Sequence, residues 1–410
     1  MHSTRRRTYL KRRLAVFGCL ALLLGGGIYV PTALLAPLAP VTAQPMPYTA
    51  PVAAEPTLDW PGYAAGAIGA ADVPGTLASN GSADPHPIAS ISKIITALMV
   101  LDEKPLAEGV PGPDITFTPA DAALYDSYLA RQGTVKPVHA GLVLSELELL
   151  QVVLVSSANN YAESLATWAF GSPEAFAAAA KDWLAAHSLT GTTLLEPTGM
   201  DPGNTSTAPD LVAIGKLAIT NPVLASIVST KSVTIPAVGT LTNTNKLLGI
   251  DGVDGIKTGT LPAAGACLLF AAEIPVGSHS TTVVGVVLGG ENHHALDAAV
   301  RDLLDSVSDG FHELTLVHAG EVFARYESPW TTSGSDAVAR SDETVVVWGG
   351  TPVGATVHTD ALRSAESGAD VGAVTFTVGS RKIRVPLVLD RGIDDPGPWW
   401  RLMNPSVLHG

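Results

Sequence analysis

The chain has 410 residues, of which 46% are hydrophobic and 15% charged, and its formal net charge is −14. This length and apolar content allow two or three domains with large cores, which indicates a globular protein rather than a disordered one. The acidic balance weighs against nucleic acid as a partner. The chain has two cysteines, Cys19 and Cys267, which excludes an intramolecular disulfide framework.

Residues 1–43 combine a basic start with a long apolar run. Six lysines and arginines lie between positions 5 and 13, and because residues 14–43 carry no charge, removing those six leaves −20 on the remainder. This pattern is typical of a signal peptide or a membrane anchor, and it predicts that the rest of the chain is exported. Val41-Thr42-Ala43 offers the small residues that a signal peptidase needs, whereas the apolar run is long enough to span a bilayer. We favour an uncleaved anchor, with secretion after cleavage as the alternative.

Residues 44–61 contain five prolines and predict an extended spacer. Residues 62–80 predict two short strands, with turns at 72–75 and 79–81. Pro87 then introduces a helix, because apolar residues recur at helical spacing after Ser90.

Ser90 and Lys93 lie one turn apart on the same face of this predicted helix. Backbone N–H groups at a helix N-terminus stabilise a nearby negative oxygen, and a buried lysine with a neutral amine can accept the proton of a serine. A serine three residues before a lysine is also common by chance. Two further segments, Ser157-Ala158-Asn159 and Lys257-Thr258-Gly259, complete the ordered trio of SxxK, SxN and KTG motifs.

A capping box of Ser145 and Glu148 predicts a helix that leads to the Ser157 turn. Beyond it, the periodicity predicts helices at about 160–170, 173–187, 207–221 and 292–311, a loop at 191–204, and strands at 232–235, 240–241, 255–260, 265–273 and 281–288. Because strands come from both ends of the segment and helices from its middle, residues 62–312 predict an α/β (α+β) domain with an antiparallel sheet and a helical lobe.

Residues 313–410 predict a separate small all-β domain without a further helix. Residues 374–378 and 383–389 alternate between apolar and polar side chains, and Gly379-Ser380 suits the two-residue turn of a hairpin. Trp399, Trp400 and Leu402 near the end predict a strap packed on this domain rather than a membrane-bound foot.

Four segments around the trio sharpen the interpretation: 87–90, 195–201, 243–249 and 252–259. Together they resemble the serine-type D-alanyl-D-alanine carboxypeptidases, the low-molecular-mass penicillin-binding proteins, over about residues 57–310. The resemblance implies a β-lactamase/transpeptidase-like catalytic domain followed by an added β domain. It also implies an extracytoplasmic hydrolase without cofactor or metal. This hydrolase would remove the terminal D-alanine from peptidoglycan stem pentapeptides and be acylated by β-lactams.

The resemblance also implies a role for each motif residue. Ser90 would be the acylated nucleophile, Lys93 its general base, and Ser157 a proton relay to the leaving amine. The substrate-binding set would be Asn159 for the substrate amide, Lys257 and Thr258 for the terminal carboxylate, and Gly259 and Thr260 beside them. Backbone N–H groups of Ser90 and Thr260 would form the oxyanion hole. Two positions depart from the family pattern: Ala158 stands where glycine is common, and Leu261 stands where many members have threonine.

Three alternatives stay open at this point. A class A-like β-lactamase shares the motifs, and Glu196-Pro197 resembles its deacylating glutamate, but the β domain and the apolar N-terminus weigh against it. A DD-endopeptidase acting on peptide cross-links would use the same machinery on a bulkier leaving group. A catalytically silent cell-wall binding protein would lack Ser90, Lys93 or Lys257, all of which are present.

Two loop features receive structural interpretations. We predict that Glu196 accepts hydrogen bonds from its own loop backbone and that Gly199 supplies a positive φ there, since no asparagine follows Glu196 before Asn204. His293 and His294 lie at a predicted helix start without a third ligand at a recognisable spacing, and they predict a solvated cap rather than a metal site.

Overall fold

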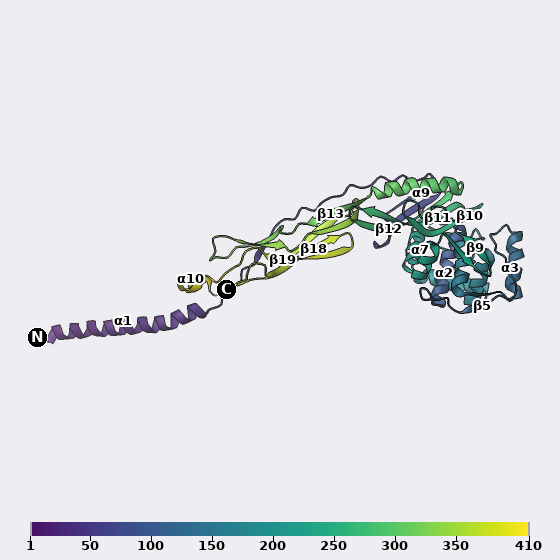
Figure 1. The fold of residues 1–410 in the computed structure, drawn as a ribbon. Coiled ribbons are helices and arrows are strands. Elements are labelled where there is room, and N and C mark those ends of the chain that lie inside the picture. The colour runs from purple at the N-terminus through teal and green to yellow at the C-terminus, as the bar shows by residue number, and fades with distance from the viewer. Residues whose placement is uncertain (1, 409–410) are drawn as a thin grey trace. The chain divides into compact units, whose positions relative to one another are not determined.

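The computed structural model describes the backbone of residues 2–408 and the side chains of residues 9–408. The chain divides into two compact units (Figure 1). Ala54–His312 contains the three motifs and is here called the catalytic unit after the expectation above, and Met1–Ala53 with Glu313–Gly410 form the β unit. Each unit has its own buried apolar cluster, so each is described separately below.

The catalytic unit contains a five-stranded antiparallel sheet in the order β10-β11-β12-β2-β3. Its strands are β10 (Val253–Leu261), β11 (Gly265–Val276), β12 (His279–Gly290), β2 (Ala65–Ala70) and β3 (Ala78–Gly81). The turn predicted at residues 79–81 is wrong, because these residues pair with β2 and place Gly81 opposite Ala65. Sheet pairing satisfies the backbone groups that the local residues could otherwise have used in a turn.

Most helices of the catalytic unit form the lobe that the sequence predicted, whereas the last one packs on β11 and β12 of the sheet. The helices are α2 (Ser92–Glu103), α3 (Pro119–Ala130), α4 (Glu146–Val155), α5 (Asn159–Phe170), α6 (Pro173–Ala186), α7 (Ala208–Thr220), α8 (Pro222–Val228) and α9 (His293–Ser308). The predicted capping box is present, since Ser145 Oγ accepts from the Glu148 N–H at 3.3 Å and Glu148 Oε2 from the Ser145 N–H at 2.9 Å. Helices α3 and α8 were not predicted, although Thr118 and Asp121 form the same kind of box before α3.

Short two-stranded ladders connect these helices. They are β4 (His86–Pro87) with β7 (Thr205–Ser206), β5 (Asp114–Thr116) with β6 (Val143–Ser145), and β8 (Ser232–Ile235) with β9 (Gly239–Thr242). Pairing of β4 with β7 ties the segment before Ser90 to the end of the Glu196 loop. The 3₁₀ turn η1 (Ala89–Ile91) then leads directly into α2.

The core of this unit lies between the sheet and the helices. Helix α7 packs on β2, β11 and β12, and a Cβ at Gly215 of α7 would lie 2.5 Å from Val284 Cγ1. Glycine at that position therefore allows the helix to approach the sheet closely. Helix α2 is buried over ten successive residues from Ser92 to Leu101, so Lys93 lies inside the protein core.

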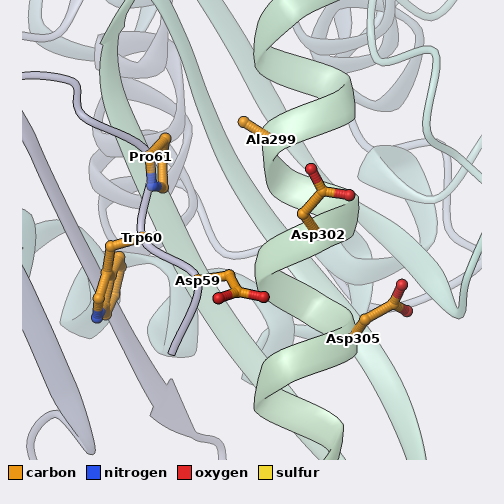
Figure 2. A pocket seen from close by; sticks show the side chains of 6 residues that line it. All are labelled: Asp59, Trp60, Pro61, Ala299, Asp302 and Asp305. Atoms are coloured by element: carbon orange, nitrogen blue, oxygen red, sulfur yellow. The ribbon is translucent and has the colours of Figure 1, made fainter. Parts of the chain in front are cut away.

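The segment before β2 lies along α9. The Asp59 N–H donates to Ser306 Oγ at 3.0 Å, and a hollow of about 410 Å³ lies between the two segments. Figure 2 shows the residues that line this hollow, which are Asp59, Trp60, Pro61, Ala299, Asp302 and Asp305. Residues 54–61 of the expected spacer thus belong to the catalytic unit.

The β unit is built on a six-stranded antiparallel sheet in the order β1-β14-β15-β19-β18-β17. Its strands are β1 (Ala43–Pro45), β14 (Val322–Tyr326), β15 (Ser335–Ala339), β19 (Arg381–Leu389), β18 (Asp370–Val378) and β17 (Val353–Thr359), and β13 (Phe311–Val317) pairs with β16 (Glu343–Trp348). The hairpin predicted around Gly379-Ser380 is confirmed, since Val378 pairs with Arg381 and Phe376 with Ile383.

Three segments of the β unit come from the two ends of the chain. Helix α1 (His2–Leu35) contains the stretch Tyr9–Leu35, which is long and apolar enough to cross a membrane. Helix α10 (Gly397–Met403) and the 3₁₀ turn η2 (Pro405–Val407) lie where no helix was predicted. The strap prediction is confirmed for Trp400 and Leu402, which pack on the unit, and is wrong for Trp399, which is 76% exposed.

Candidate active site

The turn that carries Ser90 is strained and tightly covered. Ser90 is half-buried in η1, directly after Ala89, whose φ is +46°. Gly199 of the Glu196 loop has a φ of +81°, as predicted, and a Cβ at that position would lie 1.9 Å from Ala89 O. Only glycine can therefore bring this loop onto the turn that carries Ser90.

Lys93 is buried, and its Nζ has three polar contacts. It lies 3.0 Å from Ser90 Oγ, 2.6 Å from Asn159 Oδ1 and 2.6 Å from Thr198 O. Burial lowers the pKa of Lys93 well below its ordinary value, the charge of Lys257 lowers it further, and Glu196 opposes both. A neutral amine has two N–H donors and one lone pair. The two carbonyl-type oxygens can take both donors, which leaves the lone pair for the Ser90 hydroxyl.

The SxN motif lies in the buried turn between α4 and α5. Ser157 has a φ of +60°, and Asn159 begins α5 with its backbone N–H donating to Thr134 O at 2.7 Å. The contact between Asn159 Oδ1 and Lys93 Nζ joins this motif to the SxxK motif across 66 residues of sequence. Ser157 therefore lies two residues before Asn159, which contacts Lys93 Nζ directly.

The KTG motif lies on β10, the edge strand nearest to η1. A Cβ at Gly259 would lie 2.8 Å from Ile88 O and 3.4 Å from Ser90 N, so the glycine allows β10 to pack closely against the turn that carries Ser90. Lys257 is buried, and its Nζ donates to Thr258 O at 3.2 Å. Burial lowers the pKa of Lys257 to about 7.

Two residues outside the motifs touch the KTG strand. The hydroxyls of Thr258 and Thr244 lie 2.5 Å apart, and Thr260 Oγ1 lies 2.6 Å from His293 Nε2. The solvated-cap interpretation of His293 is wrong: the residue is half-buried, and burial lowers the pKa of its ring. Asn292 caps α9 instead, its side chain accepting from the Ala295 N–H at 3.0 Å.

Glu196 organises the loop that covers Lys93. Its carboxylate accepts from the backbone N–H groups of Thr198 at 2.7 Å, Gly199 at 2.6 Å and Asp201 at 3.2 Å. Asn204 Nδ2 donates to the same carboxylate at 3.1 Å. The predicted loop hydrogen bonds of Glu196 are therefore present, and they fix the Thr198 carbonyl that contacts Lys93.

The fold is that of a transpeptidase-like protein, with an α/β catalytic unit followed by a C-terminal β-sheet domain. The crystal structure of a peptidoglycan synthesis regulatory factor (PBP3) from Streptococcus pneumoniae superimposes with a TM-score of 0.62 at 23% identity, covering 82% of this chain and 100% of that one. The family model of the D-alanyl-D-alanine carboxypeptidases, peptidase S11, matches residues 72–292. The chain belongs to this family.

Two curated relatives carry different activities in their names. A D-alanyl-D-alanine endopeptidase of Escherichia coli (strain K12) is 34% identical over 202 residues, covering 46% of this chain and 60% of that protein. The D-alanyl-D-alanine carboxypeptidase DacB2 of Mycobacterium tuberculosis (strain ATCC 25618 / H37Rv) is 33% identical over 194 residues, covering 46% of this chain and 62% of that protein. The chain thus spans about three fifths of the length of these two relatives.

Proposed function

We propose that this protein is an extracytoplasmic serine DD-peptidase that removes the terminal D-alanine from peptidoglycan stem pentapeptides through an acyl-enzyme on Ser90. Membership of the peptidase S11 family supports the reaction class. The observation that carries the assignment of residues is the set of contacts at Lys93 Nζ, which suits a neutral amine facing the Ser90 hydroxyl.

Acylation begins when the Ser90 hydroxyl gives its proton to Lys93 and Oγ attacks the carbonyl carbon of the penultimate D-alanine. The new Oγ–C bond produces a tetrahedral oxyanion, which the backbone N–H groups of Ser90 and Thr260 stabilise. The C–N bond to the terminal D-alanine then breaks, and the leaving nitrogen receives the proton from Lys93 by way of Ser157. In deacylation, Lys93 takes a proton from water and the resulting hydroxide attacks the ester carbon. The Oγ–C bond then breaks, and Lys93 returns the proton to Ser90 Oγ as the shortened peptide leaves.

Lys257 suits the terminal carboxylate of the peptide. Its Nζ is buried beside the turn that carries Ser90, and within the described part of the chain it contacts one backbone carbonyl, at 3.2 Å, which leaves N–H donors for an anion. A bound carboxylate favours the ammonium form, so substrate binding raises the pKa of Lys257 from about 7. Thr258 and Thr260 lie on the same strand and complete the proposed carboxylate site.

The second candidate function is a DD-endopeptidase, which the 34% identity to the Escherichia coli relative favours. The two candidates are separated by incubating the purified protein with a stem pentapeptide and, in parallel, with a cross-linked peptide dimer. Mass spectrometry of the products decides between them. We expect loss of one alanine from the pentapeptide at a higher kcat/KM than cleavage of the dimer, and the reverse ranking would establish the endopeptidase.

We also propose that α1 stays attached and holds the protein on the outer face of the cytoplasmic membrane. Its basic flank at positions 5–13 would lie inside, because lysine and arginine bias sets the orientation of a membrane helix. Protease added to intact, wall-stripped cells should then destroy the catalytic unit. Protection from the protease would mean that the topology is inverted.

A further inference from the structure

We infer that residues 394–408, here called the C-terminal clasp, grip the outer end of α1 and rest on the lipid headgroup layer at that end. The inference builds on the proposed retention of α1. It concerns a part of the β unit that the proposed reaction does not use.

Apolar packing forms one half of the clasp. Ala33, Ala36 and Leu38, at and just beyond the end of α1, are buried against Leu408. Three larger side chains, Trp330, Trp400 and Leu402, pack around this cluster. The rings of Trp330 and Trp400 meet edge to face with centroids 5.7 Å apart. A helix that passed directly from a membrane into solvent would leave its last turn exposed, whereas this turn is partly buried.

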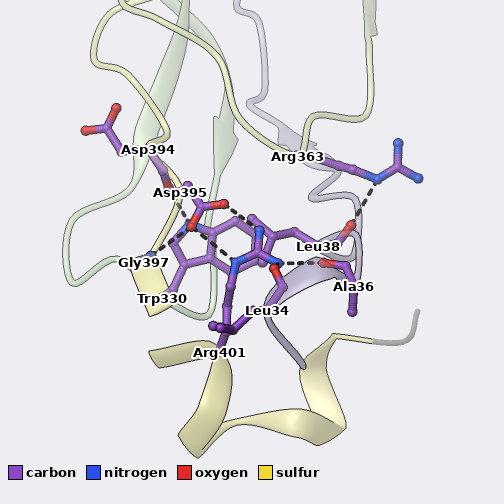
Figure 3. A network of polar contacts seen from close by, with 9 residues as sticks. All are labelled: Leu34, Ala36, Leu38, Trp330, Arg363, Asp394, Asp395, Gly397 and Arg401. Atoms are coloured by element: carbon purple, nitrogen blue, oxygen red, sulfur yellow. Dashed lines mark hydrogen bonds and ion pairs between the residues drawn. The ribbon is translucent and has the colours of Figure 1, made fainter. Parts of the chain in front are cut away.

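Polar contacts form the other half (Figure 3). Arg401 Nη1 donates to Ala36 O at 2.5 Å and to Leu34 O at 3.5 Å, and its guanidinium also pairs with Asp395. Carbonyls at the end of a helix lack intrahelical partners, and a cation there also interacts favourably with the helix dipole. Arg363 Nε donates to Leu38 O at 2.9 Å, which secures the next residues of the chain.

Two contacts place the clasp beside the apolar helix itself. Tyr29 Oη, in the second-last turn of α1, donates to Leu402 O at 2.5 Å. The chain beyond α1 then enters the β sheet directly, because Val41 and Leu362 exchange two backbone hydrogen bonds of 2.6 and 2.9 Å and Ala43 pairs with Tyr326. The β unit is therefore joined to the candidate membrane span through packed structure.

Because the β unit is joined to α1 in this way, the position of the span also sets the surroundings of the exposed face of α10. Trp399 is 76% exposed and Met403 is 66% exposed, while Leu35 at the end of α1 is 83% exposed. Tryptophan favours the membrane–water interface because its ring is amphipathic. Since α10 contacts the last turns of the span, these apolar side chains lie at headgroup depth, and the occupant of the face is the outer lipid interface.

The test uses the full chain reconstituted in phosphatidylcholine vesicles whose acyl chains carry bromine near the headgroup, which quenches tryptophan fluorescence at short range. We expect quenching relative to unbrominated vesicles, and Trp399→Phe should remove at least half of it. Trp168→Phe, in the catalytic unit, is the matched control and should leave the quenching unchanged. Equal quenching in the native chain and Trp399→Phe would overturn the lipid contact. So would a concentration-dependent dimer that shields Trp399, because it assigns the face to a second copy.

A second variant tests the grip on α1. Arg401→Met should increase the rate of proteolytic cutting between residues 36 and 46 several-fold in the same vesicles, without changing acylation of Ser90 by penicillin. An unchanged rate of cutting would contradict the clasp. The intact mass of the mature protein separates failure of the clasp from failure of the anchor. A mature chain that lacks residues 1–43 would overturn both the anchor and the clasp. An intact chain whose quenching is unchanged in Trp399→Phe and whose cutting is unchanged in Arg401→Met would overturn the clasp alone.

Discussion

The candidate site contains two buried lysines, and their surroundings differ. Lys93 Nζ has three polar contacts, two of them at 2.6 Å, whereas Lys257 Nζ has one backbone carbonyl at 3.2 Å. Burial lowers the pKa of both. Among the residues that the structure describes, two carbonyl-type oxygens contact Lys93 Nζ and one contacts Lys257 Nζ. This difference fits the two proposed roles, with Lys93 as the base and Lys257 as the cation that binds the carboxylate.

Removing the first lysine should have the largest effect. Lys93→Met keeps the length and burial of the side chain but removes the amine that faces Ser90. We expect acylation by penicillin to slow by about 10²–10⁴-fold, the usual contribution of a general base. The rate is measured by stopped-flow or intact mass, with Lys181→Met, an exposed lysine on α6, as the control. Acylation at the native rate would remove Lys93 from the base role.

Removing the second lysine should have a smaller and substrate-dependent effect. A charge-assisted hydrogen bond contributes about 1.5–3 kcal/mol, so Lys257→Met should lower kcat/KM for a carboxylate substrate by about 10- to 100-fold. The same peptide with an amidated C-terminus should lose far less. The test compares kcat/KM for the two peptides in the native protein and in the variant. An equal loss for both peptides would show that Lys257 does not bind the carboxylate.

The pH dependence should separate the two lysines without mutation. Lys257 must be protonated to bind a carboxylate, and its pKa in the free protein is about 7, so kcat/KM for the carboxylate peptide should fall as the pH rises through about 7. Lys93 must be neutral to accept a proton from Ser90. Because burial strongly lowers the pKa of Lys93, kcat/KM should fall through protonation of this amine at acidic pH. The amidated peptide should keep the acid limb and lack the fall near pH 7. If kcat/KM fell near pH 7 for both peptides, the fall would come from a group other than Lys257.

The smallest effect is expected at Glu196. Its carboxylate holds the loop through backbone N–H groups, and glutamine retains one acceptor oxygen for them. Glu196→Gln should therefore leave the lifetime of the penicilloyl enzyme within a few-fold of native. If Glu196 were the deacylating base, its loss in this variant would lengthen that lifetime by about two to four orders of magnitude, and such a result would favour the β-lactamase alternative.

Local sequence signals predicted much of this molecule. The capping box at Ser145, the hairpin at Gly379-Ser380 and the positive φ of Gly199 each depend on residues close together in sequence, and each is present. The missed features depend on distant contacts. His293 reaches Thr260 across 33 residues, and Thr198 O reaches Lys93 across 105 residues, so neither contact leaves a periodic pattern to detect.

The β unit shows the same limit. Residues 44–53 were expected in a spacer, but Gln44 pairs with Arg325 and the Tyr48 ring lies 5.3 Å from that of Phe376, because residues far along the chain supply their partners. Helix α10 contains a glycine, a proline and two tryptophans, which gave no helical signal. Its contacts with α1 and Trp330 stabilise it instead, and the local sequence does not reveal them.

The most direct test of the account asks which serine is the nucleophile. Ser92, two residues from Ser90, is fully buried, and its Oγ accepts from Asn204 Nδ2 at 3.1 Å, whereas Ser90 is half-buried beside Lys93 Nζ. Intact and peptide mass spectrometry after benzylpenicillin treatment should show one adduct, on the peptide that contains Ser90, and Ser90→Ala should show none. An adduct on Ser92 or Ser157, or no adduct on the native protein, would contradict the assignment.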